Sequence, residues 1–293
     1  MLPSSRTPGA MISFSEQTST ILEFVLVFVG LGFLVWLFLS SAGRALRASP
    51  AVLPAWEVSP TEILSLAWIV LASGFVGQVL LSLVIGHSIR DRPEGEILER
   101  IIYGSTFQLG ALLAWLYAHL RERHRRRDRV KTTSPWPRAA LGPSLRGAAL
   151  TFLAVIPLVS GASVLWEIVL RAVHLSTERQ ELVDYFTQAR SPLLLGLMIA
   201  LALLVAPVSE ELVFRAGIFR YLRTRVPRWI AFTASAGLFA LLHANWSSFL
   251  PLFVLGLVFA FAYERTGRMA VPMLAHALFN LNTLLLVLSH API

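Results

Sequence analysis

Long runs of apolar residues alternate with shorter charged segments along most of the chain. A helix of about 20 apolar residues crosses the roughly 30 Å hydrocarbon layer of a bilayer, and most of these runs reach that length. The pattern therefore predicts an all-α fold, a polytopic transmembrane helix bundle with about eight spans. We expect the spans at residues 22–41, 63–86, 101–119, 147–170, 193–213, 229–244, 248–263 and 270–289.

The sixth and seventh apolar runs are shorter than the others, and only residues 244–247 separate them. Two arrangements fit such a pair of runs. The runs either form a tight hairpin of spanning helices or are partly re-entrant.

The composition places the chain in a membrane. Apolar residues make up 56% of the sequence and charged residues only 14%, against roughly a quarter in ordinary globular chains. The mean hydropathy is +0.67, so the chain has too little polar surface to cover a soluble fold. There is no cysteine, which excludes disulfides, thiolate metal ligands and cysteine nucleophiles.

The net charge of +8 is carried mainly by loops between the spans. Basic residues are concentrated in the first, third, fifth and seventh loops. By the positive-inside rule, this bias places those loops in the cytoplasm and both termini outside. Arginine-rich loops without a targeting segment fit an integral protein of the bacterial inner membrane.

The third loop, residues 120–146, contains the sequence R-E-R-H-R-R-R-D-R-V-K. A nucleic-acid site would need a folded basic face or interleaved aromatic residues, and the loop has neither. We interpret it as a cytoplasmic loop that fixes topology and touches anionic lipid headgroups, and we expect no nucleic-acid partner. The loop divides the chain into a flexible N-terminus (1–20), N-terminal spans with the basic loop (21–146) and a core that holds the chemically interesting residues (147–293).

Two adjacent carboxylates and an arginine lie at the end of the fifth run, in the sequence P-V-S-E-E-L-V-F-R-A-G at 207–217. Ionisable groups at membrane depth are costly and usually functional. Glu210 and Glu211 are about 100° apart around a helix, so they cannot face the same way. Glu211 can pair with Arg215 at i,i+4, which leaves Glu210 free to act as a general base. Pro207 can kink the helix and let water reach the carboxylates.

Two histidines on other spans are candidates to join these groups. His243 ends the sixth run, where an ordinary interfacial histidine is the alternative interpretation. His276 lies inside the eighth run, with Asn280 at i+4 on the same face, and must form a hydrogen bond there. We expect three helices to bring their polar groups to one pocket.

A carboxylate and an imidazole can hold and deprotonate a water, while a second imidazole and an amide can donate hydrogen bonds to a developing oxyanion. These are the groups needed to hydrolyse an amide without a covalent intermediate. Glu210, His243 and His276 could instead bind Zn²⁺. The usual zinc-binding helix H-E-x-x-H is absent, so the local spacing gives zinc little support.

Three motifs in this region resemble those of a known family. E-E-L-V-F-R at 210–215, F-A-L-L-H at 239–243 and H-A-L-F-N at 276–280, the last preceded by G-L-V-F-A-F-A-Y-E-R-T-G from Gly256, resemble the CPBP intramembrane proteases. That family includes the CAAX prenyl endopeptidases and bacterial bacteriocin-processing and self-immunity proteins of the Abi type. The resemblance covers roughly residues 150–288.

The resemblance implies that Glu210 works with His243 to activate the attacking water. It also implies that His276 and Asn280 stabilise the oxyanion. Both metal-dependent and metal-free glutamate mechanisms are proposed for the family, and the sequence leaves that choice open.

The resemblance further implies that Glu211 and Arg215 support the site. Glycine usually follows the motif arginine in the family, whereas Ala216 stands here, with Gly217 one place later. Both residues are small, so this departure should matter little.

The leading hypothesis is a CAAX-type intramembrane protease that cleaves a membrane-associated peptide or protein substrate in a cavity facing the cytoplasm. Prenylated CAAX proteins are the eukaryotic substrates of the family, and a bacterial substrate stays open. One alternative is a non-catalytic immunity or regulatory partner in which the polar cluster is structural. Another is a proton-coupled transporter, although the sequence shows no internal repeat.

Overall fold

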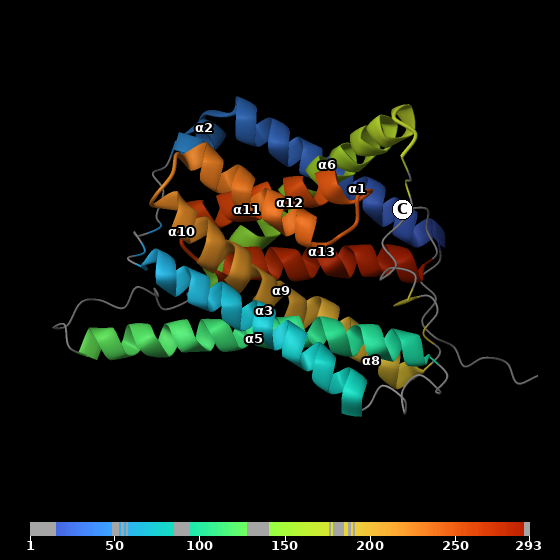
Figure 1. The fold of residues 1–293 in the computed structure, drawn as a ribbon. Coiled ribbons are helices and arrows are strands. Elements are labelled where there is room, and N and C mark those ends of the chain that lie inside the picture. Colours follow the sequence, from blue (N-terminus) through green and yellow to red (C-terminus); the bar gives the residue numbers. More distant parts are fainter. Residues whose placement is uncertain are drawn as a thin grey trace, which may run out of the picture.

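The computed structural model describes residues 16–48, 53, 56, 58–84, 94–127, 141–175, 177, 185–186, 189 and 191–289. All regular elements within these residues are helical (Figure 1). They are α1 (Glu16–Leu39), α2 (Ser41–Ala48), α3 (Pro60–Val84), α5 (Gly95–Arg127), α6 (Leu141–Ala172), α8 (Pro192–Ala200), η1 (Leu201–Val205), α9 (Ala206–Glu211), η2 (Leu212–Phe219), α10 (Arg220–Arg223), α11 (Arg228–Leu242), α12 (Phe249–Thr266) and α13 (Ala270–Leu288).

The predicted all-α, polytopic bundle is confirmed, and the chain is an integral membrane protein. Across the described residues, seven helical stretches are long and apolar enough to cross a bilayer. The sixth predicted span differs, because α11 has only 15 residues. At 1.5 Å per residue it is about 22 Å long, short of the roughly 30 Å hydrocarbon layer.

Two predicted boundaries differ from the observed helix ends. Helix α1 already begins at Glu16, inside the segment expected to be flexible, while residues 1–15 lie outside the described part. Helix α5 continues to Arg127, several residues into the expected basic loop. Residues 128–140 of that loop also lie outside the described part.

The helices form two groups on either side of the fifth span (Figure 1). On one side, α6 packs against α12, α13 and α1, and α11 packs against α12. On the other side, α3 and α5 pack against each other as a pair, and α5 contacts α9 and η2. The fifth span, built from α8, η1, α9, η2 and α10, therefore lies between the core helices and the α3–α5 pair.

The fifth span is irregular around the two glutamates. Its residues 201–205 (η1) and 212–219 (η2) are π-helical, and the six-residue α9 lies between them. Pro207 has no N–H to donate, so the ordinary α-helical hydrogen bonding cannot continue through it. The irregularity before Pro207 is therefore a π-helical turn, of the kind often found at functional sites.

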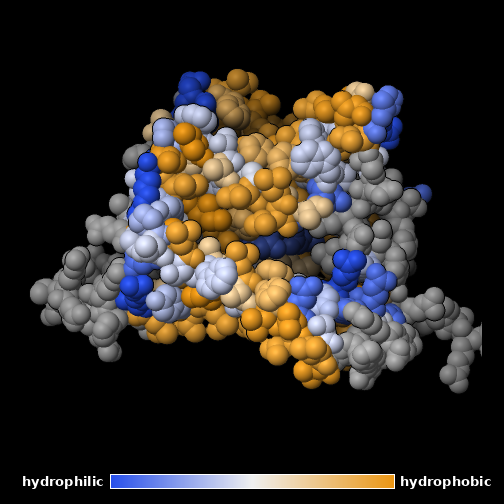
Figure 2. All heavy atoms as spheres, viewed as in Figure 1, coloured by the Kyte–Doolittle hydropathy of each residue, from blue (hydrophilic) through white to orange (hydrophobic). Residues whose placement is uncertain are grey.

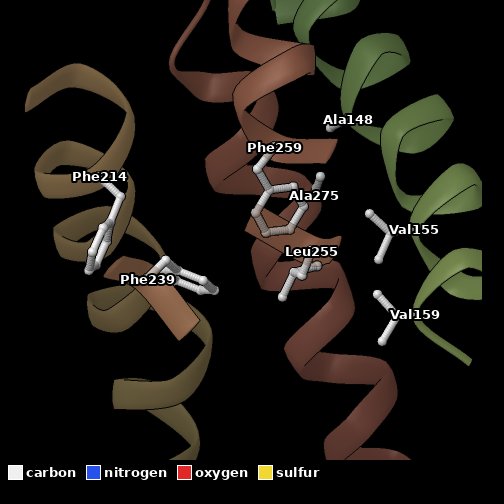
Figure 3. Close-up of a cluster of buried hydrophobic side chains, with 8 residues drawn as sticks. All are labelled: Ala148, Val155, Val159, Phe214, Phe239, Leu255, Phe259 and Ala275. Carbon is white, nitrogen blue, oxygen red and sulfur yellow. The ribbon is translucent and has the colours of Figure 1, made fainter. Parts of the chain in front are cut away.

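A buried aromatic cluster joins the fifth span to the core helices (Figure 3). Phe214 from η2 meets Phe239 from α11 edge to face, with ring centroids 5.1 Å apart. The cluster is completed by residues of α12, α13 and α6, namely Leu255, Phe259, Ala275, Ala148, Val155 and Val159. Burial of these side chains fixes the helices that carry the polar residues described next.

Candidate active site

The structure brings the predicted polar residues of three helical segments into one cluster. Glu210, Glu211 and Arg215 come from the fifth span. His243 comes directly after α11, and His276 comes from α13. Their contacts, given below, connect residues up to 66 positions apart in the sequence.

The innermost contact is the ion pair between Glu211 and Arg215. Arg215 Nη1 lies 3.0 Å from Glu211 Oε1, and the side chains are 1% and 0% exposed, which confirms the predicted i,i+4 pairing. Arg215 also donates to the carbonyl of Gly256 at 3.3 Å. Its guanidinium lies 4.5 Å from the ring centroid of Phe239 and 5.4 Å from that of Phe259. These aromatic faces favour a cation in a place that water does not reach.

His276 lies against this ion pair. Its Nδ1 is 3.0 Å from Glu211 Oε1, the same oxygen that contacts Arg215. An ionised carboxylate only accepts hydrogen bonds, so Nδ1 carries a proton and donates it to Glu211. The other ring nitrogen, Nε2, points toward Glu210, whose Oε2 is 3.8 Å away. Glu211 therefore fixes the orientation of His276 and presents Nε2 to the pocket.

His243 is oriented by its own helix. Its Nδ1 lies 2.7 Å from the carbonyl oxygen of Phe239. Because a carbonyl cannot donate, Nδ1 must carry the proton, and Nε2 of the neutral ring is an acceptor. This nitrogen lies 4.0 Å from Glu210 Oε2.

Glu210 is the point where the two imidazoles converge. Its Oε2 is too far from either Nε2 for a direct hydrogen bond. Glu210 and His243 are 25% and 23% exposed, whereas Glu211 and Arg215 behind them are sealed. Figure 2 shows a hollow in the apolar surface, over α13 and between α11 and α3, with hydrophilic atoms at its floor. The side chains of Glu210 and His243 are thus partly exposed in front of a buried charged layer, while the Oε2 atom of Glu210 is itself buried.

Asn280 lies one helical turn beyond His276, as the sequence indicates, but its amide makes a backbone contact. Its Nδ2 donates to the carbonyl of Ala202 in η1 at 2.8 Å. An amide nitrogen has two N–H groups, so this bond leaves one of them for another acceptor.

The donor types around Glu210 match zinc, but their spacing does not. Neighbouring ligand atoms of a tetrahedral zinc site with bonds of about 2.0–2.1 Å are about 3.3 Å apart. The oxygen of Glu210 is instead 3.8 and 4.0 Å from the two histidine nitrogens. Within the described residues, no group of three or more His, Cys, Asp or Glu side chains is arranged to hold a metal ion.

Two further contributors are not evident from the sequence. Phe239 touches both His243 (ring centroids 4.7 Å apart) and His276 (6.2 Å), as well as Arg215. Ser235, one turn earlier on the same helix, is buried and donates to the carbonyl of Phe214 at 3.0 Å. The only local signal was that Phe239 precedes His243 by four residues and so shares its helix face.

Comparison with known proteins confirms the family resemblance over part of the chain. Residues 192–282 match a family model described as type II CAAX prenyl endopeptidase Rce1-like. All six predicted site residues lie within this segment.

Two curated relatives align with a similar length of sequence. The chain is 37% identical over 84 residues to the protein named "Putative membrane peptidase YdiL" of Bacillus subtilis (strain 168). This alignment covers 29% of the chain and 34% of that relative. It is 39% identical over 84 residues to the membrane-embedded CAAX protease MroQ of Staphylococcus aureus (strain USA300), covering 26% and 34%. The chain thus spans about a third of the length of these relatives. No solved structure matches the chain significantly.

Proposed function

We propose that the chain is an intramembrane endopeptidase in which Glu210 and His243 activate a water for attack on a peptide bond. The observation that carries this proposal is the position of Glu210 Oε2, 3.8 and 4.0 Å from the Nε2 atoms of two histidines. This oxygen is buried and has no hydrogen-bond partner among the described residues, although the Glu210 side chain as a whole is 25% exposed. The likeness of residues 192–282 to CAAX prenyl endopeptidases supports the same chemistry.

The geometry suits a single water between Glu210 and His243. A polar gap of 4.0 Å is typical of a water-bridged contact. A water about 2.8 Å from both atoms would see them at roughly 90°, close to the angle between its own two O–H bonds. Because Glu210 Oε2 and the unprotonated Nε2 are both acceptors, the water donates both protons and keeps its lone pairs for the carbonyl carbon. Glu210 then takes one proton as the general base.

His276 and Asn280 are proposed to stabilise the oxyanion that forms on the carbonyl. Since Nδ1 of His276 already donates to Glu211, its Nε2 can donate only when the ring carries both protons. Glu211 would stabilise that positive ring, and Arg215 holds Glu211 in place. Asn280 contributes the N–H that is not bonded to Ala202. Removal of one such donor typically costs about 10²–10³ in rate.

The proposed mechanism uses no metal ion, because the distances from Glu210 Oε2 to the two histidine nitrogens are longer than those between neighbouring zinc ligands. Measurement of zinc in the purified protein, together with cleavage before and after chelation, tests that choice.

The proposed substrate is a membrane-associated peptide or protein, because the partly exposed Glu210 side chain belongs to a membrane protein with an apolar surface. A peptide ending in a prenylated CAAX box is the first probe, given the names of the family model and of one relative. We further propose a bacterial inner-membrane location with the cavity toward the cytoplasm, from the distribution of basic residues.

The decisive experiment compares the intact protein with Glu210→Gln in a bilayer. We expect Glu210→Gln to abolish cleavage of an internally quenched, prenylated CAAX peptide, or of membrane peptides identified by proteomics. The unfolding midpoint should stay unchanged, because no direct hydrogen bond of Oε2 is lost. The matched control is Glu167→Gln, whose carboxylate belongs to an exposed pair on α6.

Full cleavage by a folded Glu210→Gln protein would contradict the role of Glu210 as the general base. Absence of cleavage by the folded parent protein would favour the alternative, a non-catalytic immunity or regulatory partner. The complete burial of the Glu211–Arg215 pair would then serve only the packing of the bundle.

A further inference from the structure

We propose that Asn280 is a positioning residue that holds the π-helical turn η1 through the carbonyl of Ala202 and thereby orients Glu210 and Glu211. The hydrogen bond between Asn280 and Ala202 is observed in the structure. Its effect on cleavage rests on the function proposed above.

The hydrogen-bond register explains why the carbonyl of Ala202 needs a partner from outside its helix. The N–H of Ala206 bonds to the carbonyl of Leu201, five residues earlier. The next donor in this register, for the carbonyl of Ala202, would be residue 207. That residue is a buried proline and has no N–H. Asn280 Nδ2, at 2.8 Å, supplies the missing donor from α13.

A partner at this place matters because lipid offers none. An unsatisfied backbone carbonyl in the hydrocarbon region is costly, and broken helices persist there only where neighbouring helices or side chains satisfy the freed groups. The turn and the proline come just before the two glutamates, so the register held at Ala202 decides which way α9 presents them.

One face of α13 therefore holds the fifth span at two points. Asn280 binds it at Ala202, before Pro207, and His276 binds it at Glu211, after Pro207. Asn280 and His276 are four residues apart and share a helix face. The two contacts bracket the irregular stretch, and loss of the first leaves only the second to fix the position of Glu210.

A double-mutant cycle separates this role from that of an oxyanion donor. The proteins are the parent, Asn280→Ala, Pro207→Ala and the double variant, assayed on the quenched CAAX peptide and by thermal unfolding. Alanine at 207 restores an N–H near the carbonyl of Ala202. We expect the loss of kcat caused by Asn280→Ala, with KM unchanged, to be about tenfold smaller when Pro207 is also alanine. The loss that remains in that background is the contribution of Asn280 as an oxyanion donor. The shift in unfolding midpoint should shrink in the same way.

An equal loss of kcat in both backgrounds, with equal midpoint shifts, would overturn the proposal, because a donor that touches only the substrate is independent of Pro207. Amide hydrogen exchange gives a second measurement that needs neither cleavage nor the proline variant. Asn280→Ala should accelerate exchange across residues 201–212 several-fold.

The matched control for exchange is Asn282→Ala on the same helix, since Asn282 Nδ2 bonds to Glu23 Oε2 on α1 at 2.9 Å instead. Exchange in residues 201–212 should be unchanged in this control. If Asn280→Ala also left the exchange of residues 201–212 unchanged, the proposed positioning role of Asn280 would be refuted. Absence of cleavage by the parent protein would count against the proposed function while the exchange result still decided the role of Asn280.

Discussion

Glu211 Oε1 accepts a hydrogen bond from Nδ1 of His276 at 3.0 Å. His276 lies on α13, 65 residues later in the sequence. The same oxygen pairs with Arg215 at 3.0 Å, so one carboxylate joins a structural ion pair to a histidine that faces the pocket. The buried charges and the accessible ones are thus parts of one cluster. This relationship makes the consequences of separate substitutions different and testable.

Glu211→Gln should destabilise the protein strongly. It removes the carboxylate that pairs with Arg215 and leaves that guanidinium buried without its counter-charge. Breaking a buried pair in this way typically costs about 3–5 kcal/mol. Unfolding of the purified protein in mixed micelles with increasing SDS measures the change.

The control for this prediction is Glu167→Gln, which breaks a pair of the same residue types and spacing at the exposed end of α6. Exposed pairs contribute about 0–1 kcal/mol. Similar losses for the two variants would show that burial does not determine the effect.

His243→Ala should abolish cleavage with only a small effect on folding. The side chain is part-exposed, and its Nε2 faces Glu210 rather than a structural partner. Loss of a proton-transfer group typically lowers the rate by about 10²–10⁴. Cleavage of the CAAX peptide and the unfolding midpoint are measured together. His119→Ala, which removes a histidine stacked on Trp115 away from the cluster, should retain activity.

Gly256→Ala should destabilise the contact between α12 and α11. A Cβ at this position would lie 3.0 Å from both Cα and Cβ of Ala236, so the helices would have to move apart. Overpacking of this kind costs about 1–3 kcal/mol. The carbonyl of Gly256 also accepts from Arg215, so cleavage should fall as well.

Gly237→Ala on α11 is the matched control, because a Cβ there meets nothing within 4 Å. In a helix the change should be neutral or stabilising by up to about 1 kcal/mol. Equal destabilisation by both alanines, measured by unfolding in SDS, would contradict the packing argument.

Glu264→Gln should destabilise the protein less than Glu211→Gln. Glu264 is buried and contacts Arg223 Nε and Arg228 Nη2, each at 2.6 Å, where α10, α11 and α12 meet. Both arginines are part-exposed and can be hydrated once the carboxylate is lost. We expect a loss of about 1–3 kcal/mol in the free energy of unfolding. A loss larger than that of Glu211→Gln would argue against the role of hydration.

The sequence predicted those features that depend on local periodicity. Apolar runs of spanning length gave the helical bundle, and the i,i+4 spacing gave the pair of Glu211 with Arg215. The convergence of Glu210, His243 and His276 was expected because isolated polar groups in apolar helices need partners. That argument indicates which residues meet, but it does not give their distances.

Features that depend on how the helices pack together could not be predicted from the sequence. The position of Phe239 between Arg215 and two histidines depends on how α11 lies against the fifth span. The π-helical register before Pro207 is set by a donor on α13, so the contact of Asn280 with Ala202 could not be read from either segment alone.

The shortness of α11 bears on the lipid around the protein. At about 22 Å, α11 is less than half as long as α6, whose 32 residues span about 48 Å. Where α11 faces lipid, it therefore offers a shorter apolar surface to the bilayer. Acyl chains beside α11 must shorten or tilt to match it, at a cost of fractions of a kcal/mol per Å of mismatch. We therefore expect the stability of the protein to depend on the hydrocarbon thickness of the bilayer. A thinner membrane should reduce the mismatch on the side where α11 faces lipid.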